Sequence, residues 1–207
     1  MRGYYFITDA ALSRQGNVVD VRDAVAAGVE VVQYRHKTAA TEEMYNEASA
    51  LRKICAGIIF LINDRIDIAL AVGADGVHLG QEDMPVPAAR KLLGKQKIIG
   101  VSVHSLSQAL AAQKAGADYV AVAPVFAAKT KTNAGVPRGV KLLRDIKKKL
   151  KIPVVAIGGI TLANAALVIA AGADAVCAIS CVVTSAKIKR QIIKFQHMFK
   201  TVSCQEN

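Results

Sequence analysis

The chain has 207 residues, enough for one domain with a sizeable hydrophobic core. Hydrophobic residues make up 53% of it and charged residues 21%, which excludes a disordered or low-complexity chain. The apolar runs are too short to span a membrane, and the N-terminus lacks the pattern of a secretion signal. The net charge is +11, but the lysines follow helical spacing without an aromatic ladder, so a solvated surface or a small anionic ligand is favoured over nucleic acid. The four scattered cysteines predict reduced thiols in a cytoplasmic protein.

Short apolar runs alternate with segments of helical periodicity along the whole chain. In chain order, the predicted strands cover residues 4–8, 30–34, 58–62, 76–79, 97–101, 118–122, 153–157 and 173–178. The helices predicted after them cover residues 18–27, 41–55, 66–72, 85–93, 105–115, 140–150, 161–171 and 185–199. The strands are apolar throughout rather than alternating, as in a parallel sheet that is buried on both faces.

A Gly-Ala-Asp phrase recurs at residues 73–75, 116–118 and 172–174, with Gly-Val-Glu at 28–30 as a looser copy. Each copy precedes an even-numbered predicted strand, where glycine ends a helix and a short polar residue sets the turn. Eight strand–helix units in about 200 residues predict a single (β/α)8 TIM barrel domain over residues 1–207. A doubly wound open sheet is the alternative.

Two aspartates follow neighbouring predicted strands: Asp64 after the third and Asp83 after the fourth. Because one strand–helix–strand unit returns the chain to the same edge of a parallel sheet, both carboxylates are expected side by side. Ligands bind at this edge in parallel α/β folds, and paired carboxylates suit a hard cation such as Mg²⁺. Either aspartate alone could instead cap the helix that follows it, but their matched positions favour a metal site.

Polar side chains also end the second and fifth predicted strands. Gln33, Arg35 and Lys37 alternate along the chain, so they are expected on one side, where Arg and Lys would form an anion site. A solvated loop is the alternative. Ser102 and His104 end the fifth strand, and a lone histidine in such a place is more often structural than catalytic.

Three further segments at this edge have the composition of phosphate sites. Residues 129–135, in the loop after the sixth strand, are basic and rich in hydroxyl groups, as in a lid, although a mobile linker is the alternative. Gly158-Gly159 leads into a helix, and Ile179-Ser180 ends the eighth strand, at the corner where barrels often bind phosphate. One metal-assisted and one metal-free anion site predict two phosphorylated substrates, or one substrate with two phosphoryl groups.

These residues lie in motifs that cover nearly the whole chain. The motifs are QYRHK (33–37), NDR (63–65), DGVHLGQEDMP (75–85), GVSVHS (100–105), Thr130-Lys131, PVVAIGGI (153–160) and AIS (178–180). Together they resemble the thiamine-phosphate synthase family. The resemblance implies an enzyme that joins a pyrimidine methyl diphosphate to a thiazole phosphate and releases pyrophosphate by a dissociative mechanism.

The resemblance also implies roles for individual residues. It implies Mg²⁺ on Asp64 and Asp83, and catalytic roles for Lys131, Arg35 and Ser102. The residues expected to hold the pyrimidine diphosphate are Gln33, Arg35, Lys37, Asn63, Ser102 and Lys131, and those expected to hold the thiazole phosphate are Thr130, Gly159, Ile179 and Ser180. No protein nucleophile is required, and the sequence leaves the oligomeric state open, a homo-oligomer included.

The sequence departs from the family pattern at two positions near the expected thiazole site. Ala128 stands where the family usually has a threonine, and Ala123 where it usually has a glycine. Two alternatives therefore stay open. One is the related thiazole tautomerase branch, which has a histidine at the position of Pro124. The other is a non-catalytic barrel that binds phosphate ligands, although Asp64, Asp83 and Lys131 speak against it.

Overall fold

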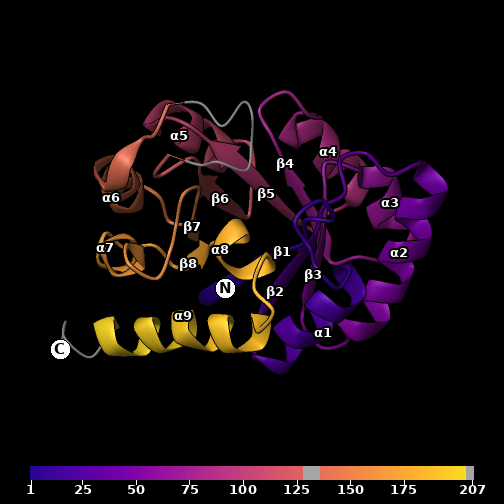
Figure 1. Cartoon of the computed structure of the whole chain (residues 1–207). Helices are drawn as coiled ribbons and strands as arrows, with labels where there is room; N and C mark the ends of the chain where they lie inside the picture. The colour runs from indigo at the N-terminus through magenta and orange to yellow at the C-terminus, as the bar shows by residue number, and fades with distance from the viewer. Residues whose placement is uncertain (128–135, 204–207) are drawn as a thin grey trace.

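The computed structural model describes residues 1–127 and 136–203, and its parallel strands form a closed barrel (Figure 1). In order around the barrel the strands are β1 (Gly3–Ile7), β2 (Val31–Tyr34), β3 (Ile59–Asn63), β4 (Gly76–Leu79), β5 (Ile98–Val103), β6 (Tyr119–Val122), β7 (Val154–Ile157) and β8 (Ala175–Cys177). Gly3 of β1 lies opposite Ala175 of β8, so the sheet closes on itself. The predicted (β/α)8 barrel is confirmed, and the doubly wound alternative is wrong.

Helices surround the strands on all sides in Figure 1. Those in the described residues are α1 (Asn17–Ala26), α2 (Thr41–Ile54), α3 (Ile66–Ala71), α4 (Val86–Leu93), α5 (Leu106–Lys114), α6 (Gly139–Lys149), α7 (Ala165–Ala170), α8 (Ile179–Val183) and α9 (Ile188–Ser203). No helix in this part of the chain combines the length and the apolar character that crossing a membrane requires.

The last strand and the helix after it differ from the prediction. Strand β8 ends at Cys177, and Ile179 and Ser180 belong to the first turn of α8 instead of the strand end. A helix of five residues is too short to show helical periodicity in a sequence. Helix α7 also begins later than predicted, because the Asn164 side chain accepts a hydrogen bond from the Thr161 backbone N–H (2.8 Å) and holds a separate turn before it.

Apolar side chains form two cores, one on each face of the cylindrical sheet. The larger core lies between the barrel and its helices and includes Phe60, Val77 and Val120. The smaller core fills the barrel interior and includes Tyr5 and Tyr119. Two tyrosines in the interior place hydroxyl groups where a barrel usually has aliphatic side chains.

The repeated Gly-Ala-Asp phrase has a shared structural role at the amino ends of the strands. Asp75, Asp118 and Asp174 precede strands β4, β6 and β8. Each carboxylate accepts a backbone N–H from the start of the preceding strand, at 2.8, 2.7 and 2.8 Å. Each also forms an ion pair with a helix residue, at 3.0, 2.6 and 2.6 Å. The repeat therefore joins consecutive strands at this end of the barrel.

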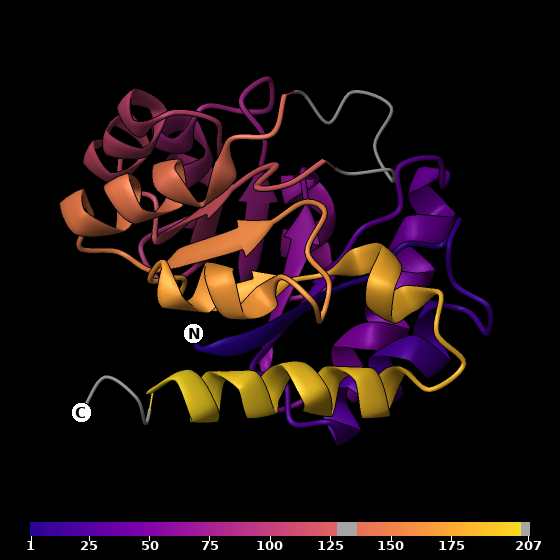
Figure 2. The ribbon, with the colours of Figure 1, turned by 60° about the vertical axis from the view of Figure 1, so that its left-hand side comes forward.

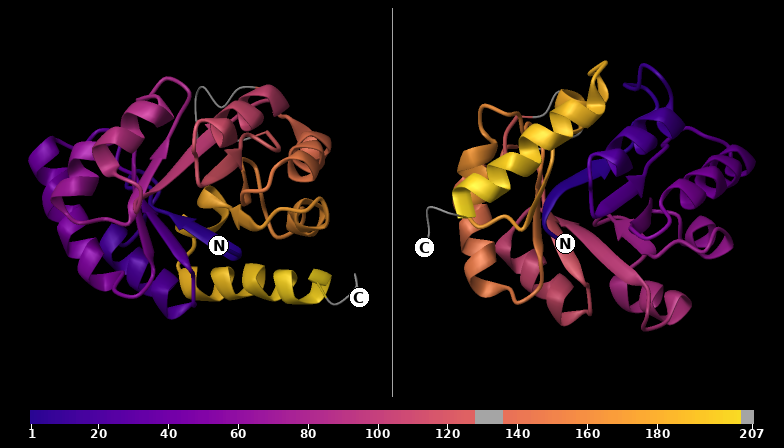
Figure 3. Two further views of the ribbon diagram at one scale, coloured as in Figure 1. Left: turned by 180° about the vertical axis from the view of Figure 1, so that it is seen from behind. Right: turned by 90° about the horizontal axis from the view of Figure 1, so that it is seen from below.

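Helix α9 packs against the first strand at the opposite end of the chain. It contacts β1, α1 and α7, and Figures 2 and 3 show it beside the N-terminus. The Tyr4 and Phe195 rings pack at a tilt of 38° with centroids 5.2 Å apart, and the Gln196 side chain accepts a hydrogen bond from the Tyr4 backbone N–H (3.2 Å). This helix thus fixes β1, from which Tyr5 reaches into the barrel.

Candidate active site

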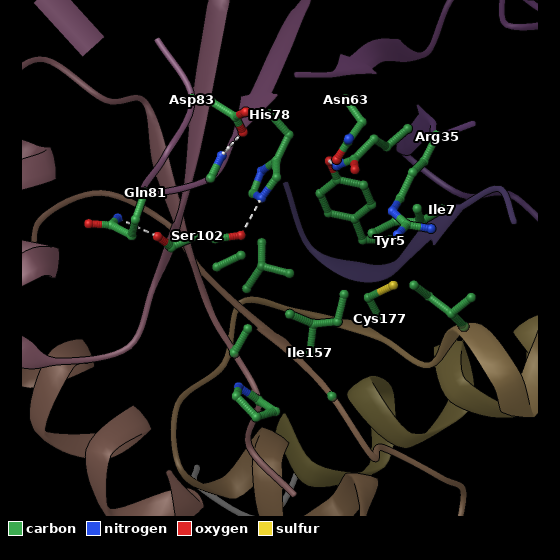
Figure 4. Close-up of a pocket in the computed structure, with 18 of the residues that line it drawn as sticks. Tyr5, Ile7, Arg35, Asn63, His78, Gln81, Asp83, Ser102, Ile157 and Cys177 are labelled. Atoms are coloured by element: carbon green, nitrogen blue, oxygen red, sulfur yellow. Dashed lines mark hydrogen bonds between the residues drawn. The ribbon is translucent and has the colours of Figure 1, made fainter. Parts of the chain in front are cut away.

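A pocket of about 490 Å³ opens at the carboxyl ends of the strands (Figure 4). Its floor is the barrel interior, with Tyr5, Ile157 and Cys177, and its rim carries polar and charged side chains. Each strand of the barrel contributes a lining residue, in order Tyr5, Gln33, Asn63, His78, Ser102, Ala121, Ile157 and Cys177. The fold therefore gathers residues that are far apart in sequence around one cavity.

The structure brings together most of the residues that the sequence singled out. Those lining the pocket are Gln33, Arg35, Lys37, Asn63, Asp83, Ser102 and Ile179. Asp64 lies beside Lys37 and Asp83 at the rim. Gly159 and Ser180 are not among the lining residues. The predicted contacts Thr130 and Lys131 lie outside the described residues, as does Ala128.

Asp64 and Asp83 form a carboxylate pair at the rim. Asp64 follows β3 with a φ of 62°, a left-handed conformation that aspartate tolerates better than most residues, and its N–H donates to the His78 carbonyl (2.9 Å). Its carboxylate forms an ion pair with Lys37. Asp83 accepts the Gly80 backbone N–H (2.6 Å). Neither α3 nor α4 has a side-chain hydrogen bond at its N-cap, so the alternative of simple helix capping is wrong.

The carboxyl group of Asp64 disfavours the charged form of Asp83. Burial and the neighbouring Asp64 carboxyl raise the pKa of Asp83, although the Gly80 N–H and Lys37 act in the opposite direction. A divalent cation between them would remove this repulsion, which is the behaviour expected of a hard-metal site. The described residues contain no group of three or more His, Cys, Asp or Glu side chains placed to hold a metal, so a cation here would need further oxygen ligands from elsewhere.

Arg35 is held at the pocket rim by the end of the first strand. Its guanidinium pairs with the Asp9 carboxylate (3.2 Å), and both side chains are mostly buried. Its backbone N–H donates to the Thr8 hydroxyl (2.8 Å). The sequence analysis missed Asp9, although it follows a strand end as Asp64 and Asp83 do. That pairing orients Arg35 beside the pocket that Asp9 also lines.

A hydrogen-bonded row of polar side chains crosses the pocket floor. Gln33 Nε2 donates to the Tyr5 hydroxyl (2.6 Å), and the Tyr5 and Tyr119 hydroxyls are 2.8 Å apart. His78 Nδ1 lies 2.8 Å from the Tyr119 hydroxyl, and His78 Nε2 lies 2.9 Å from Ser102 Oγ. We call these five residues the interior chain. The sequence analysis missed its two tyrosines and His78, and the signal was present: His78 alone is polar and ionisable in strand β4.

The wall of the pocket at strands β5 to β7 is built by close backbone contacts. His104 Nδ1 lies 2.6 Å from the Ala123 carbonyl, which agrees with the structural role expected of this histidine. A Cβ at Gly158 would lie 2.6 Å from Pro124 Cβ, and one at Gly159 would lie 2.4 Å from the Ala127 carbonyl. The two glycines thus let the segment after β6 pack on the end of β7, a reason for their presence besides the close approach of a ligand.

A closed (β/α)8 barrel with paired carboxylates, Arg35 and Lys37 around a polar-floored pocket defines a barrel enzyme for an anionic, phosphate-bearing ligand. Comparisons with known proteins identify the family. A family model described as thiamine monophosphate synthase matches residues 4–182.

Thiamine-phosphate synthase from Methanosarcina barkeri is 52% identical over 198 residues, which are 95% of this chain and 90% of the relative. The Chloroflexus aurantiacus enzyme of the same name is 50% identical over 184 residues, 87% of this chain and 85% of the relative. A solved structure, thiamine phosphate pyrophosphorylase from Pyrococcus furiosus, is 40% identical with a TM-score of 0.89 and covers 97% of this chain and 96% of that one. The chain therefore belongs to the thiamine-phosphate synthase family, which confirms the resemblance and the predicted transferase activity.

Proposed function

We propose that the protein transfers the pyrimidinylmethyl group of 4-amino-2-methyl-5-(diphosphooxymethyl)pyrimidine to thiazole phosphate, giving thiamine phosphate and pyrophosphate. One observation carries this proposal. The Asp64–Asp83 pair, Lys37 and Arg35 meet at one rim of a pocket whose floor can bind a flat polar ring. A diphosphate at the rim and a pyrimidine below it would satisfy both parts of the pocket.

The carboxylate pair fits Mg²⁺ better than it fits any structural role seen in the fold. The raised pKa of Asp83 reflects burial and a second carboxyl beside it, a combination that a divalent cation would relieve. Mg²⁺ in proteins commonly takes one or two carboxylates and completes its shell with water and substrate phosphate. When bound, it would supply charge neutralisation for a departing diphosphate.

The side chains of the pocket divide into two groups in this proposal. Gln33, Asn63 and Ser102 orient the pyrimidine diphosphate, while Arg35 and Lys37 bind its phosphate oxygens. Lys131, predicted from its Thr-Lys motif, would join the phosphate contacts from the loop after β6. The thiazole phosphate would lie toward β7 and β8, where the residues proposed to hold it are Thr130, Gly159, Ile179 and Ser180.

The reaction needs positioning and charge stabilisation but no protein nucleophile. The bond between the pyrimidine methylene carbon and the diphosphate oxygen breaks, and both electrons leave with pyrophosphate. The thiazole nitrogen then gives its lone pair to the methylene carbon and forms the new C–N bond. Arg35, Lys37 and Lys131 stabilise the charge that grows on the leaving oxygen. The apolar walls of the pocket, including Ile7 and Ile157, limit the access of water to the carbocation.

The experiment is direct. Purified protein is mixed with both phosphorylated substrates and Mg²⁺, and thiamine phosphate and pyrophosphate are quantified together. Equal amounts of the two products support the proposal. Binding of both substrates without either product would favour the non-catalytic alternative, and isomerisation of the thiazole alone would favour the tautomerase alternative. We further propose that the chain acts in the cytoplasm as a single-domain enzyme, alone or as a homo-oligomer.

A further inference from the structure

The interior chain depends on a glycine in the strand between its members. His78 on β4 lies in register with Gly100 on β5, and Gly100 lies in register with Tyr119 on β6. A Cβ at Gly100 would lie 2.0 Å from Tyr119 Cζ, so the ring occupies the space that a side chain would take. Tyr119 therefore crosses β5 and stacks on His78, with ring centroids 5.5 Å apart and planes at 28°.

The donors and acceptors of the interior chain determine the direction in which its hydrogen bonds run. Within the described part of the protein, the fully buried Tyr5 hydroxyl has two hydrogen-bond partners, Gln33 Nε2 and the Tyr119 hydroxyl. The Gln33 amide nitrogen can only donate, so the Tyr5 proton goes to Tyr119; a buried hydroxyl proton without an acceptor would be costly. Tyr119 then donates to His78 Nδ1, which leaves His78 protonated at Nε2 and donating to Ser102 Oγ.

We propose that Tyr5 and Tyr119 are positioning residues that fix His78 in its Nε2–H tautomer and so turn the Ser102 hydroxyl proton toward the ligand. If Ser102 Oγ accepts from His78, its own proton is directed away from the imidazole and into the pocket that Ser102 lines. Ser102 is then a hydrogen-bond donor of fixed direction.

The chemistry of the tyrosines agrees with this direction. Burial raises the pKa of both Tyr5 and Tyr119, so both stay neutral hydroxyl donors across the physiological range. A network with every buried member satisfied is rigid, which suits a group that must be aimed before the substrate arrives. The contribution of an oriented Ser102 hydroxyl to catalysis rests on the function proposed above, in which Ser102 orients the pyrimidine diphosphate. The inferred tautomer of His78 does not depend on that function.

The tautomer is measured first, on the free protein. With ¹⁵N-labelled histidine, a long-range ¹H–¹⁵N correlation spectrum distinguishes protonated from unprotonated ring nitrogens, and the His78→Asn variant assigns the signals of this one of four histidines. We expect a protonated Nε2 and an unprotonated Nδ1. Protonation at Nδ1 with an unprotonated Nε2 would mean that the hydrogen bonds of the interior chain run in the opposite direction, and it would overturn the proposal.

Variants then test which side chains set the tautomer. Tyr119→Phe should replace the single tautomer by a mixture, and Gly100→Ala should do the same by displacing the ring although its hydroxyl is still present. Tyr34→Phe is the matched control, because Tyr34 is equally buried but donates to Glu47 (2.7 Å) outside the barrel. A single unchanged tautomer in Tyr119→Phe would refute the proposal even if Gly100→Ala fails to fold.

Steady-state kinetics test whether the orientation of the Ser102 hydroxyl contributes to substrate binding. Tyr119→Phe should raise the KM for the pyrimidine diphosphate roughly two- to tenfold, the range of one neutral hydrogen bond, and leave the KM for thiazole phosphate unchanged. Equal rises in both constants would indicate a general loss of barrel packing and would count against the positioning role. If the unaltered protein forms no thiamine phosphate, the proposed function fails, but the tautomer measurement still decides the present inference.

Discussion

Aspartates gather at both ends of this barrel, and their surroundings differ. At the amino ends of the strands, Asp75, Asp118 and Asp174 each accept a backbone N–H from the preceding strand and pair with one cation. At the carboxyl ends, Asp64 and Asp83 lie beside each other, and the second carboxyl helps to raise the pKa of Asp83. The first group is satisfied by the protein itself. The second group also has partners in the protein, Lys37 for Asp64 and the Gly80 N–H for Asp83, but its two carboxyl groups lie against each other, and in the function proposed above a bound cation would relieve that repulsion.

The largest expected effect comes from the carboxyl end. Asp64→Ala or Asp83→Ala should reduce turnover by about 100-fold or more, because a bound cation contributes several kcal/mol of charge stabilisation. The melting temperature should fall modestly, because Asp64→Ala puts an alanine at the left-handed φ of 62° and Asp83→Ala leaves the Gly80 N–H without its acceptor, while each change relieves the carboxylate repulsion. Steady-state assays over a Mg²⁺ titration, with thermal melts, measure both. If both variants retained near-normal rates without Mg²⁺, the metal assignment would be lost.

The next effect concerns Lys131, which lies between β6 and α6 in the sequence and outside the described residues. Lys131→Ala should lower kcat by roughly 10²–10³-fold with a modest change in KM, because a preorganised cation stabilises the leaving group most in the transition state. Lys129→Ala is the control and should change little, because Lys129 lies outside the Thr130-Lys131 motif and a charge without a specific contact is largely screened by salt. Both are compared at saturating substrates and Mg²⁺. Equal losses of kcat in the two variants would mean that the lysines contribute only general positive charge and that Lys131 has no specific catalytic role.

The sequence predicted the two ends unequally. The Gly-Ala-Asp repeat and the strand-end positions of Asp64 and Asp83 are local patterns, so the barrel and the carboxylate pair could be found from spacing alone. The repeat was explained only as a turn signal, however, because the N–H groups that its aspartates hold belong to strands 15 to 20 residues away.

The pocket floor was harder to predict for the same reason. Tyr5, His78 and Tyr119 come from three strands, and their meeting depends on barrel closure and on the missing side chain of Gly100. The two tyrosines look like ordinary strand residues in the sequence, and His78, although it is the ionisable residue of β4, has no neighbour in the sequence that indicates its partners. The short helix α8 was missed because five residues do not span enough turns to show a period.

At the amino ends of the strands, removing an aspartate should lower the stability of the fold without lowering the turnover. Asp174→Ala removes the acceptor of the Val154 N–H and the partner of Lys147. A hydrogen bond to a charged group contributes about 1.5–3 kcal/mol, so the melting temperature should fall by about 3–12 °C in a chain of this size. The turnover of the folded fraction should stay normal at moderate temperature. A fall in kcat at full folding would mean that the two ends are coupled.

The smallest effect separates the two contacts of that aspartate. Lys147→Met keeps the apolar stem that lies over Gly172, where an added Cβ would meet Lys147 Cγ at 2.9 Å, and removes the charge. Both members of the pair are about one-third exposed, so the ion pair should contribute less than about 1 kcal/mol and weaken with salt. Chemical denaturation at low and high ionic strength compares this variant with Asp174→Ala. If the two variants lose equal stability, the stabilising effect of Asp174 comes from its ion pair with α6 and not from its backbone contact with β7, and the repeated aspartates stabilise the barrel chiefly through their cations.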